Sequence, residues 1–153
     1  MNQSQNLLKF ICRICLLLPL LVGCKPHSYA LLFIHNLTDK DLVVKANINT
    51  KEYVQFSVGA DSVVNVADSG VYDYYIKEVP ISEFVSNPDA SVQVYVEEEN
   101  ELILVKEWKY SEKDDAGKQF FNELFLYRID GSEPDGGEYY SYYFIITQDD
   151  IDQ

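Results

Sequence analysis

Residues 41–48 read Asp-Leu-Val-Val-Lys-Ala-Asn-Ile, and this stretch decides the fold class. Every second side chain is aliphatic, which is the period of an extended strand with one face in a core. The predicted inward set is Leu42, Val44, Ala46 and Ile48. The predicted outward set is Val43, Lys45 and Asn47. The stretch is therefore expected to be a half-buried strand.

The same kind of segment recurs on both sides of this strand. Runs rich in Val, Ile, Tyr and Phe alternate with turns made of Asn, Asp, Gly and Ser, as in all-β proteins. An inward set is also expected at Val54, Phe56 and Val58, and a turn at Asp68-Ser69-Gly70. The expected strands cover residues 29–37, 41–48, 54–58, 62–67, 71–79, 91–97, 101–110, 118–129 and 139–147. Residues 118–129 are expected to be one long strand or a strand after a bend.

Two of these segments predict a hairpin, with residues 98–100 as its tip. One inner face would contain Val92, Val94 and Val96, and the other Leu102, Leu104 and Trp108. Residues 80–90 predict one or two turns of helix, or a structured loop. Thr147-x-x-Asp150 resembles a capping box that opens a final turn. The whole predicts a mainly β fold, an antiparallel β-sandwich of about seven to nine strands with one short helix.

The last strand is dense in tyrosine, at positions 139, 140, 142 and 143. Exposed aromatic rings on a rigid sheet can stack sugars or anchor a protein partner. The candidate binding surface is therefore Tyr139, Tyr140, Tyr142 and Tyr143. The alternative is that Tyr140 and Tyr142 belong to the core, with Tyr139 and Tyr143 covering a sheet face.

A glycine-rich loop before this strand gathers four carboxylates, at Asp130, Glu133, Asp135 and Glu138. Hard cations such as Ca²⁺ need several converging oxygen ligands, so this loop is a candidate calcium site. Pro134 occupies the third ligand position of an EF-hand loop, which excludes that motif. A solvated turn is the favoured interpretation, and no other metal or cofactor is expected.

Catalytic motifs are missing from the sequence, which predicts that the protein is not an enzyme. There is no Gly-x-Ser-x-Gly elbow, no phosphate-binding glycine loop and no His-Glu-x-x-His. The histidines are His27 and His35, and neither has a recognisable triad around it. A small hydrolase that uses a pair of carboxylates stays open as an alternative, because acidic residues are abundant.

The net charge of the chain indicates which classes of partner it can bind. The chain has 153 residues, enough for one domain, with 12 basic and 25 acidic residues. Only Lys9 and Arg13 precede Cys24, and no acidic residue does, so the rest of the chain carries 10 basic and 25 acidic residues, a net charge of −15. Nucleic acid is therefore excluded as a partner, because phosphate binding needs clustered Lys and Arg.

The N-terminus has the layout of a secretory leader. Residues 1–13 are polar with two positive charges, and residues 14–22 are apolar. This run is about half of the ~20 residues that a transmembrane helix needs. Gly23 supplies the small residue that signal cleavage requires, and Cys24 follows it. Cleavage is therefore expected between Gly23 and Cys24.

The stretch Leu21-Val22-Gly23-Cys24 resembles the lipobox of bacterial lipoproteins. The resemblance implies a diacylglycerol on Cys24, cleavage before it, and acylation of the freed amine. The expected organisation is a signal peptide at 1–23, a lipidated tether at 24–28 and one domain at 29–153. Lys25 and the lack of an acidic run after it imply the outer membrane, facing the periplasm, with surface exposure undecided.

The whole chain resembles small lipoproteins of unassigned role from Bacteroidota. The resemblance is carried by the lipobox and by residues 33–41, 108–111 and 144–151. It implies a membrane-anchored protein of the cell envelope. We expect a non-catalytic domain that binds an envelope protein or a glycan. The alternative to this is a protective or inhibitory lipoprotein that neutralises a basic protein.

Overall fold

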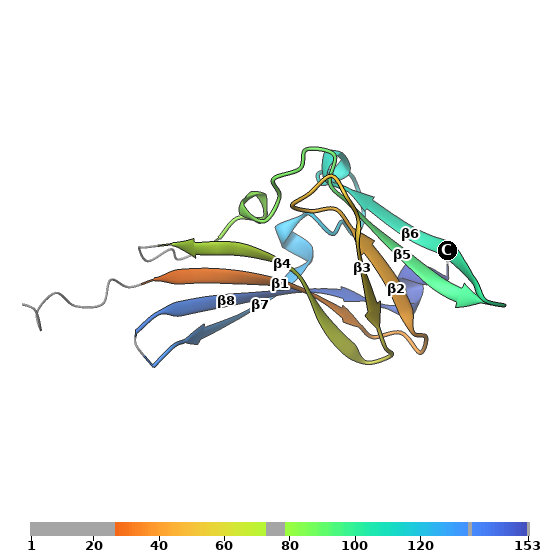
Figure 1. The fold of residues 1–153 in the computed structure, drawn as a ribbon, viewed down its shortest axis with the longest axis horizontal. Coiled ribbons are helices and arrows are strands. Elements are labelled where there is room, and N and C mark those ends of the chain that lie inside the picture. The colour runs from red at the N-terminus through yellow and green to blue at the C-terminus, as the bar shows by residue number, and fades with distance from the viewer. Residues whose placement is uncertain (1–26, 73–78, 135, 153) are drawn as a thin grey trace, which may run out of the picture.

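The computed structural model describes residues 27–72, 79–134 and 136–152, and it confirms the predicted mainly β fold. Eight strands form two four-stranded sheets that enclose one hydrophobic core (Figure 1). Gly23 and Cys24 lie outside the described residues, so the predicted cleavage and lipidation stay predictions. Among the residues that are described, no helix has the length and apolarity needed to span a membrane.

Sheet A has the strand order β4-β1-β8-β7. Its strands are β1 (Ser28–Asn36), β4 (Ser62–Tyr72), β7 (Leu126–Ser132) and β8 (Glu138–Ile146). The sequence predicted only antiparallel neighbours, but β1 and β8 pair in parallel, with Ser28 opposite Glu138 and Asn36 opposite Ile146. A parallel pair needs a long crossover connection, and here the chain passes through six other strands of both sheets between β1 and β8.

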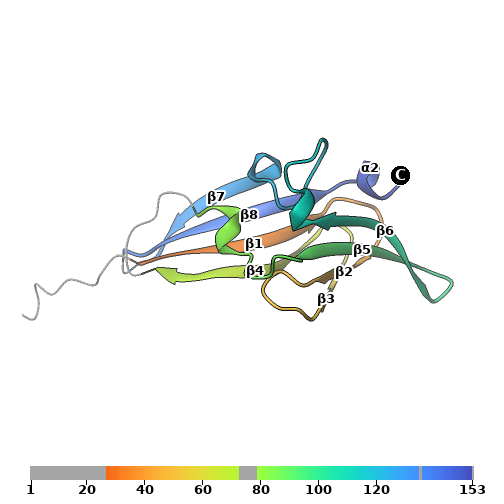
Figure 2. The same cartoon turned by 90° about the horizontal axis from the view of Figure 1, so that it is seen from above.

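Sheet B has the strand order β3-β2-β5-β6, and all its pairs are antiparallel. Its strands are β2 (Leu42–Ala46), β3 (Val54–Val58), β5 (Ser91–Glu98) and β6 (Glu101–Lys109). Figure 2 shows β7 at one margin of sheet A and β4 at the opposite margin. The inward set of residues 41–48 is buried as predicted. Asn47 was expected outside but is buried, where its side chain accepts a hydrogen bond from the Ser91 amide at 2.6 Å.

The predicted hairpin forms between β5 and β6, but one of its faces differs from the prediction. Val92, Val94 and Val96 are buried, as is Trp108, whereas Leu102 and Leu104 are exposed. A bulge explains this, because the register jumps from Tyr95↔Leu104 to Val94↔Lys106. One extra residue reverses which side chains of β6 face the core, so Leu102 and Leu104 point outward.

Val54 also differs from the prediction, and its position on an edge strand explains the difference. Val54 pairs with Ala46 and Val58 pairs with Leu42, so both lie on the predicted inner side of β3. Val58 is buried, but Val54 is exposed because β3 is the edge strand of sheet B. The side of a strand is a local property, whereas burial depends on what covers that side.

The predicted turn at residues 68–70 is wrong. β4 continues through these residues and stays paired with β1, and the extra residues are absorbed as register shifts. Gly70 adopts a positive φ of 79°, and the Ser69 hydroxyl accepts a hydrogen bond from the Ala30 amide at 2.9 Å. Bulges of this kind keep a long edge strand paired where the residue count does not match.

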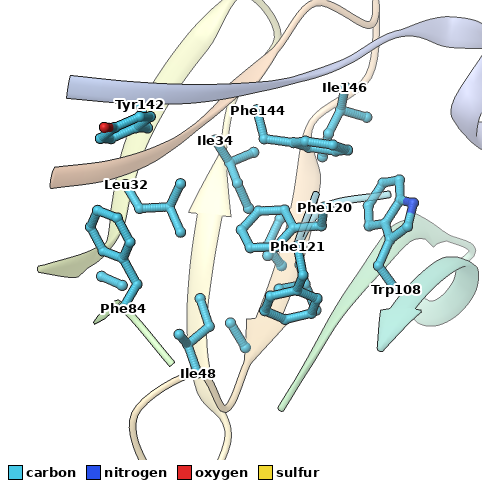
Figure 3. Packing of buried hydrophobic residues seen from close by; sticks show 14 of the residues in the cluster. Leu32, Ile34, Ile48, Phe84, Trp108, Phe120, Phe121, Tyr142, Phe144 and Ile146 are labelled. Atoms are coloured by element: carbon cyan, nitrogen blue, oxygen red, sulfur yellow. The ribbon is translucent and has the colours of Figure 1, made fainter. Parts of the chain in front are cut away.

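The core between the sheets is filled by aromatic residues from connections as well as from strands (Figure 3). Phe84 follows the 3-10 turn η1 (Ile81–Glu83), which stands where the short helix was predicted. Phe120 and Phe121 are both buried, although a strand was predicted over 118–129. Adjacent residues of a strand point to opposite faces, so two consecutive core phenylalanines require irregular backbone here. The strand β7 begins only at Leu126, after the 3-10 turns η2 (Tyr110–Glu112) and η3 (Glu123–Phe125).

The chain ends in the short helix α2 (Gln148–Ile151), and the predicted capping box is present. The carboxylate of Asp150 accepts hydrogen bonds from the Thr147 amide at 2.8 Å and from the Thr147 hydroxyl at 2.9 Å. The same carboxylate forms an ion pair with Lys118. Burial alone would raise the pKa of Asp150, but the hydrogen bonds from Lys118 and Thr147 outweigh it and lower that pKa below its usual value. Asp150 thus ties α2 to the loop before β7.

Candidate binding face

The four predicted binding tyrosines of β8 divide between its two faces. Tyr140 and Tyr142 are buried in the core, whereas Tyr139 and Tyr143 lie on the outer face of sheet A. The Tyr140 hydroxyl donates to Glu138, and the Tyr142 hydroxyl accepts from the Val79 amide. Buried phenols are satisfied in this way, so only Tyr139 and Tyr143 are available to a ligand.

The outer tyrosines of β8 stack on aromatic residues of β1. The parallel register places Tyr29 beside Tyr139 and Phe33 beside Tyr143. The ring centroids are 5.9 Å apart in the first pair and 5.0 Å apart in the second, and both pairs are stacked. Residues that are directly opposite on paired strands share one face, which is why the two strands make a single aromatic surface.

Strand β7 extends this surface to the edge of the sheet. Tyr127 lies opposite Tyr143, with ring centroids 6.5 Å apart, and its side chain is 61% exposed. Ile129 is next on the same side and is 45% exposed. We call the outer surface formed by five residues the aromatic face: Tyr29, Phe33, Tyr127, Tyr139 and Tyr143.

At one end of the aromatic face, the Tyr29 hydroxyl binds a carboxylate. Its hydroxyl donates a 2.7 Å hydrogen bond to Glu133. This hydrogen bond, together with burial and the negative charge of Glu133, raises the pKa of Tyr29 to about 12. The phenol therefore stays neutral at physiological pH and holds the Glu133 carboxylate at the border of the face.

The outer face of sheet B is different in character. Tyr95 is its central aromatic residue, and its hydroxyl donates to Gln93 at 2.7 Å. Gln93 in turn donates to Glu107, and the Lys45 ammonium lies 4.6 Å from the centre of the Tyr95 ring. These polar groups satisfy one another within the sheet. The two outer faces are therefore chemically distinct, and the aromatic surface belongs to sheet A.

The described carboxylates of the candidate calcium loop each have a separate partner. Glu133 accepts from Tyr29, Glu138 accepts from Tyr140, and Asp130 forms an ion pair with Arg128 at 2.7 Å. Asp135 lies outside the described residues. In the part of the chain that the structure describes, no three His, Cys, Asp or Glu side chains are grouped so that they could hold a metal ion.

The two histidines lie in unrelated places. His35 is on β1, with Nε2 at 3.7 Å from the Asp61 carboxylate. The backbone of His27 receives a hydrogen bond from the Glu138 amide at 2.9 Å, next to the start of β1. Neither of these described contacts brings a nucleophile and a base together.

Sequence analysis missed three members of the aromatic face. Tyr29 and Phe33 were assigned to a strand, but their side was left open, and Tyr127 was placed in a longer strand without a role. The alternation of Tyr29, Leu31, Phe33 and His35 along β1 was the available signal. The sequence did not indicate which strand lies beside β1, because pairing between strands more than 100 residues apart is decided by the tertiary structure.

Fold and site together define a mainly β protein of two four-stranded sheets with an aromatic outer face. Comparison of the chain with protein-family models, with curated proteins and with solved structures finds no significant match. Function must therefore be inferred from the residues and their geometry.

Proposed function

We propose that the protein is a membrane-anchored lipoprotein of the cell envelope that binds a protein partner through the aromatic face, without catalysis. The observation that carries this proposal is the row of stacked rings on sheet A. Tyrosines held in place by a sheet offer large contact area at low entropic cost, and they are enriched where binding energy concentrates.

The arrangement of the rings favours a protein over a glycan. Sugars stack on the open face of an aromatic ring. In the pairs Tyr29–Tyr139 and Phe33–Tyr143, each ring turns a face to its neighbour, and the pairs are close to parallel at 24° and 14°. One face of each of these four rings is therefore covered by its neighbour, which leaves less open ring surface for a sugar. Closely packed aromatic side chains supply the large contact area that protein interfaces use.

Net charge favours a basic partner. The chain after Cys24 carries 10 basic and 25 acidic residues, and Glu133 borders the aromatic face. Complementary charge accelerates association and weakens binding as salt is added. This feature keeps the protective or inhibitory role open as a second candidate, because a basic toxin or enzyme is one such partner.

The lipid on Cys24 would supply the membrane affinity. A strongly acidic domain is repelled by anionic head groups, so it cannot bind a bacterial membrane by charge. Several acyl chains on one cysteine give stable anchoring, since each buried methylene contributes ~0.8 kcal/mol. The domain would thus be held at the membrane while its aromatic face stays accessible.

Photo-crosslinking in the envelope tests the binding proposal. The full chain would carry a benzoylphenylalanine at position 127 in one strain and at position 53 in another. Tyr53 is 45% exposed but lies beside β3 of sheet B, which makes it the matched control. We expect a discrete protein adduct from position 127 that disappears with Tyr143→Ala. No adduct at 127, or equal adducts at both positions, would contradict a partner on the aromatic face.

A further inference from the structure

The edge strand β7 combines three properties that favour pairing with another strand. It is an edge strand that pairs only with β8 in the described structure, and its seven-residue register has no shift. It borders the aromatic face through Tyr127 and Ile129. The segment from Leu124 to Ile129 also has four exposed apolar side chains: Leu124, Phe125, Tyr127 and Ile129. The edge strand β6 has a comparable group, Leu102 to Leu104, but that group lies beyond its bulge.

The other three edges are protected or shorter. β4 contains two register shifts, and β6 contains one together with two lysines, Lys106 and Lys109. β3 has five residues. Natural proteins block sheet edges with such bulges, lysines and short strands to prevent pairing with another chain. β7 has neither a bulge nor a lysine, its inward-facing charges Arg128 and Asp130 neutralise each other, and no described strand pairs with its outer edge.

From this edge we infer that two copies of the protein pair through β7, antiparallel and centred on Ile129, to form one continuous eight-stranded sheet. The sequence of β7 is complementary to itself in this register. Arg128 of each copy comes opposite Asp130 of the other, on the inner side of the sheet. On the outer side, Tyr127 comes opposite Gly131 and therefore beside the Tyr139 ring that lies against that glycine.

Charge within the strand supports a second copy over a foreign strand. Arg128 and Asp130 already form an ion pair within β7, with atoms 2.7 Å apart, so β7 has no net charge. In the centred register the two Arg–Asp pairs become a four-membered network across the two-fold axis. Opposite charges on directly facing residues stabilise a sheet, and like charges destabilise it. A one-residue slip would place Arg128 opposite Ile129 and lose this match.

The pairing is closed, because each copy has only one β7 edge and the contact uses the same surface on both sides. The outer surfaces of the two sheets A then join, which doubles the aromatic face. The two β1 strands begin at opposite ends of the joined sheet. Two lipid tethers can then enter the same membrane when the strands run along its surface. The pairing itself does not depend on the proposed binding function.

Cysteine crosslinking of the full chain, in membranes of the expressing bacterium, tests the inference. Residues facing each other across antiparallel strands have Cβ atoms roughly 5 Å apart, which is within reach of a disulfide. Ile129→Cys should therefore give a disulfide-linked dimer under mild oxidation. Tyr127→Cys is the matched control, because the two copies of residue 127 would be separated by four residues along the strand, roughly 13 Å. It should crosslink far less, although Tyr127 is the more exposed side chain.

Further arms of the experiment make each outcome decisive. The wild-type protein is the control for disulfides through its native cysteines, which stay in the chain if the leader is not removed. A dimer in wild type would therefore point to unprocessed leader and not to pairing through β7. Val54→Cys on the β3 edge should stay monomeric. In the Ile129→Cys background, Arg128→Asp should abolish the dimer and the swapped pair Arg128→Asp/Asp130→Arg should restore it. No dimer from Ile129→Cys, equal dimers from positions 127 or 54, or no restoration by the swap would overturn the inference.

The salt dependence of the crosslinking yield distinguishes direct pairing of two copies from pairing through a basic partner. Two acidic copies repel each other, and screening shortens the Debye length from about 14 Å to about 4 Å between 0.05 M and 0.5 M salt. The yield of the Ile129→Cys dimer should therefore rise with salt. A yield that falls with salt would mean that a basic molecule brings the copies together, and direct pairing would be wrong.

Discussion

The ring of Tyr139 lies against the backbone of Gly131 on the neighbouring strand. A Cβ atom built on Gly131 would stand 2.1 Å from Cζ of Tyr139, much closer than atoms can approach. The backbone of Gly131 does not have a positive φ, so the requirement for glycine comes from space and not from conformation. Gly131 thus allows Tyr139 to lie flat over β7 and to stack on Tyr29.

Replacing this glycine should disturb the aromatic face. We expect Gly131→Ala to displace the Tyr139 ring and to lower the free energy of unfolding by about 1 kcal/mol, through overpacking and loss of the stack with Tyr29. Urea denaturation measures this loss. The neighbouring Ser132→Ala is the control. The same glycine substitution should cost much less in a Tyr139→Ala background, and an equal cost there would contradict the contact.

Asp150 should contribute to stability in a pH-dependent way. Its pKa is lowered in the folded protein, so its contribution is complete above the unfolded value of about 3.9 and is lost as the pH falls through the folded value. Asp150→Asn should destabilise the protein by about 2 kcal/mol at pH 7, because it weakens a helix cap and an ion pair.

Urea denaturation of wild type and Asp150→Asn at pH 7 and near pH 3 checks this prediction. The difference between the two proteins should shrink at the lower pH, where the wild-type carboxylate becomes protonated. Asp152→Asn, which changes an exposed carboxylate of the same segment, serves as the control. A difference that stays constant with pH would refute the role of the charge.

The tip of the β5–β6 hairpin should be improved by glycine. Glu99 and Asn100 both have positive φ, 52° and 67°, which is the geometry of a type I′ turn. Glu99→Gly should raise the free energy of unfolding by roughly 0.5–1 kcal/mol, because a left-handed conformation costs glycine nothing. Glu98→Gly, in the strand, should lower it instead. Thermal unfolding of the two variants decides whether the signs differ.

Phe120 should be among the most sensitive core positions. It is fully buried and its ring contacts Phe121, Phe144 and Trp108. Phe120→Ala should cost about 3–5 kcal/mol, as expected for the loss of a buried phenylalanine. Phe125→Ala, a few residues later and 38% exposed, should cost much less. Comparable losses for the two would mean that the connection does not fill the core.

The proposed anchor depends on one sulfur atom. Cys24→Ser should leave the domain folded but should move the protein from the membrane fraction to the soluble periplasmic fraction, because the acidic domain has no other membrane affinity. Fractionation and circular dichroism measure the two properties separately. If the variant stays with membranes after salt and carbonate washing, an uncleaved leader or a partner is the anchor.

Residues 41–48 show how well a local pattern predicts a strand. Their aliphatic residues are buried as alternation requires, and the capping box at Thr147 and Asp150 forms because all its partners lie within one turn. The hairpin of residues 91–109 was also predictable, since its two strands are adjacent in the chain. In these cases each interaction is short-range along the sequence.

The failures occur where long-range packing decides the outcome. Leu102 and Leu104 face outward because one bulge in β6 reverses the alternation, and Val54 is exposed because it lies on the edge strand β3. Phe120 and Phe121 lie in a strand-like sequence, but both side chains are buried in the core between the two sheets. No window of a few residues contains that information.

By itself, the sequence determined that the chain forms strands, which side chains alternate along most of them, and that the chain after Cys24 is strongly acidic. Only the tertiary structure decided that β8 returns beside β1 in parallel, which brings Tyr139 to Tyr29 and Tyr143 to Phe33. It also decided that β7 is the last strand of sheet A among the residues that the structure describes. The physical reason is that alternation follows from backbone geometry, whereas the neighbour of a strand depends on how the whole chain buries its apolar surface.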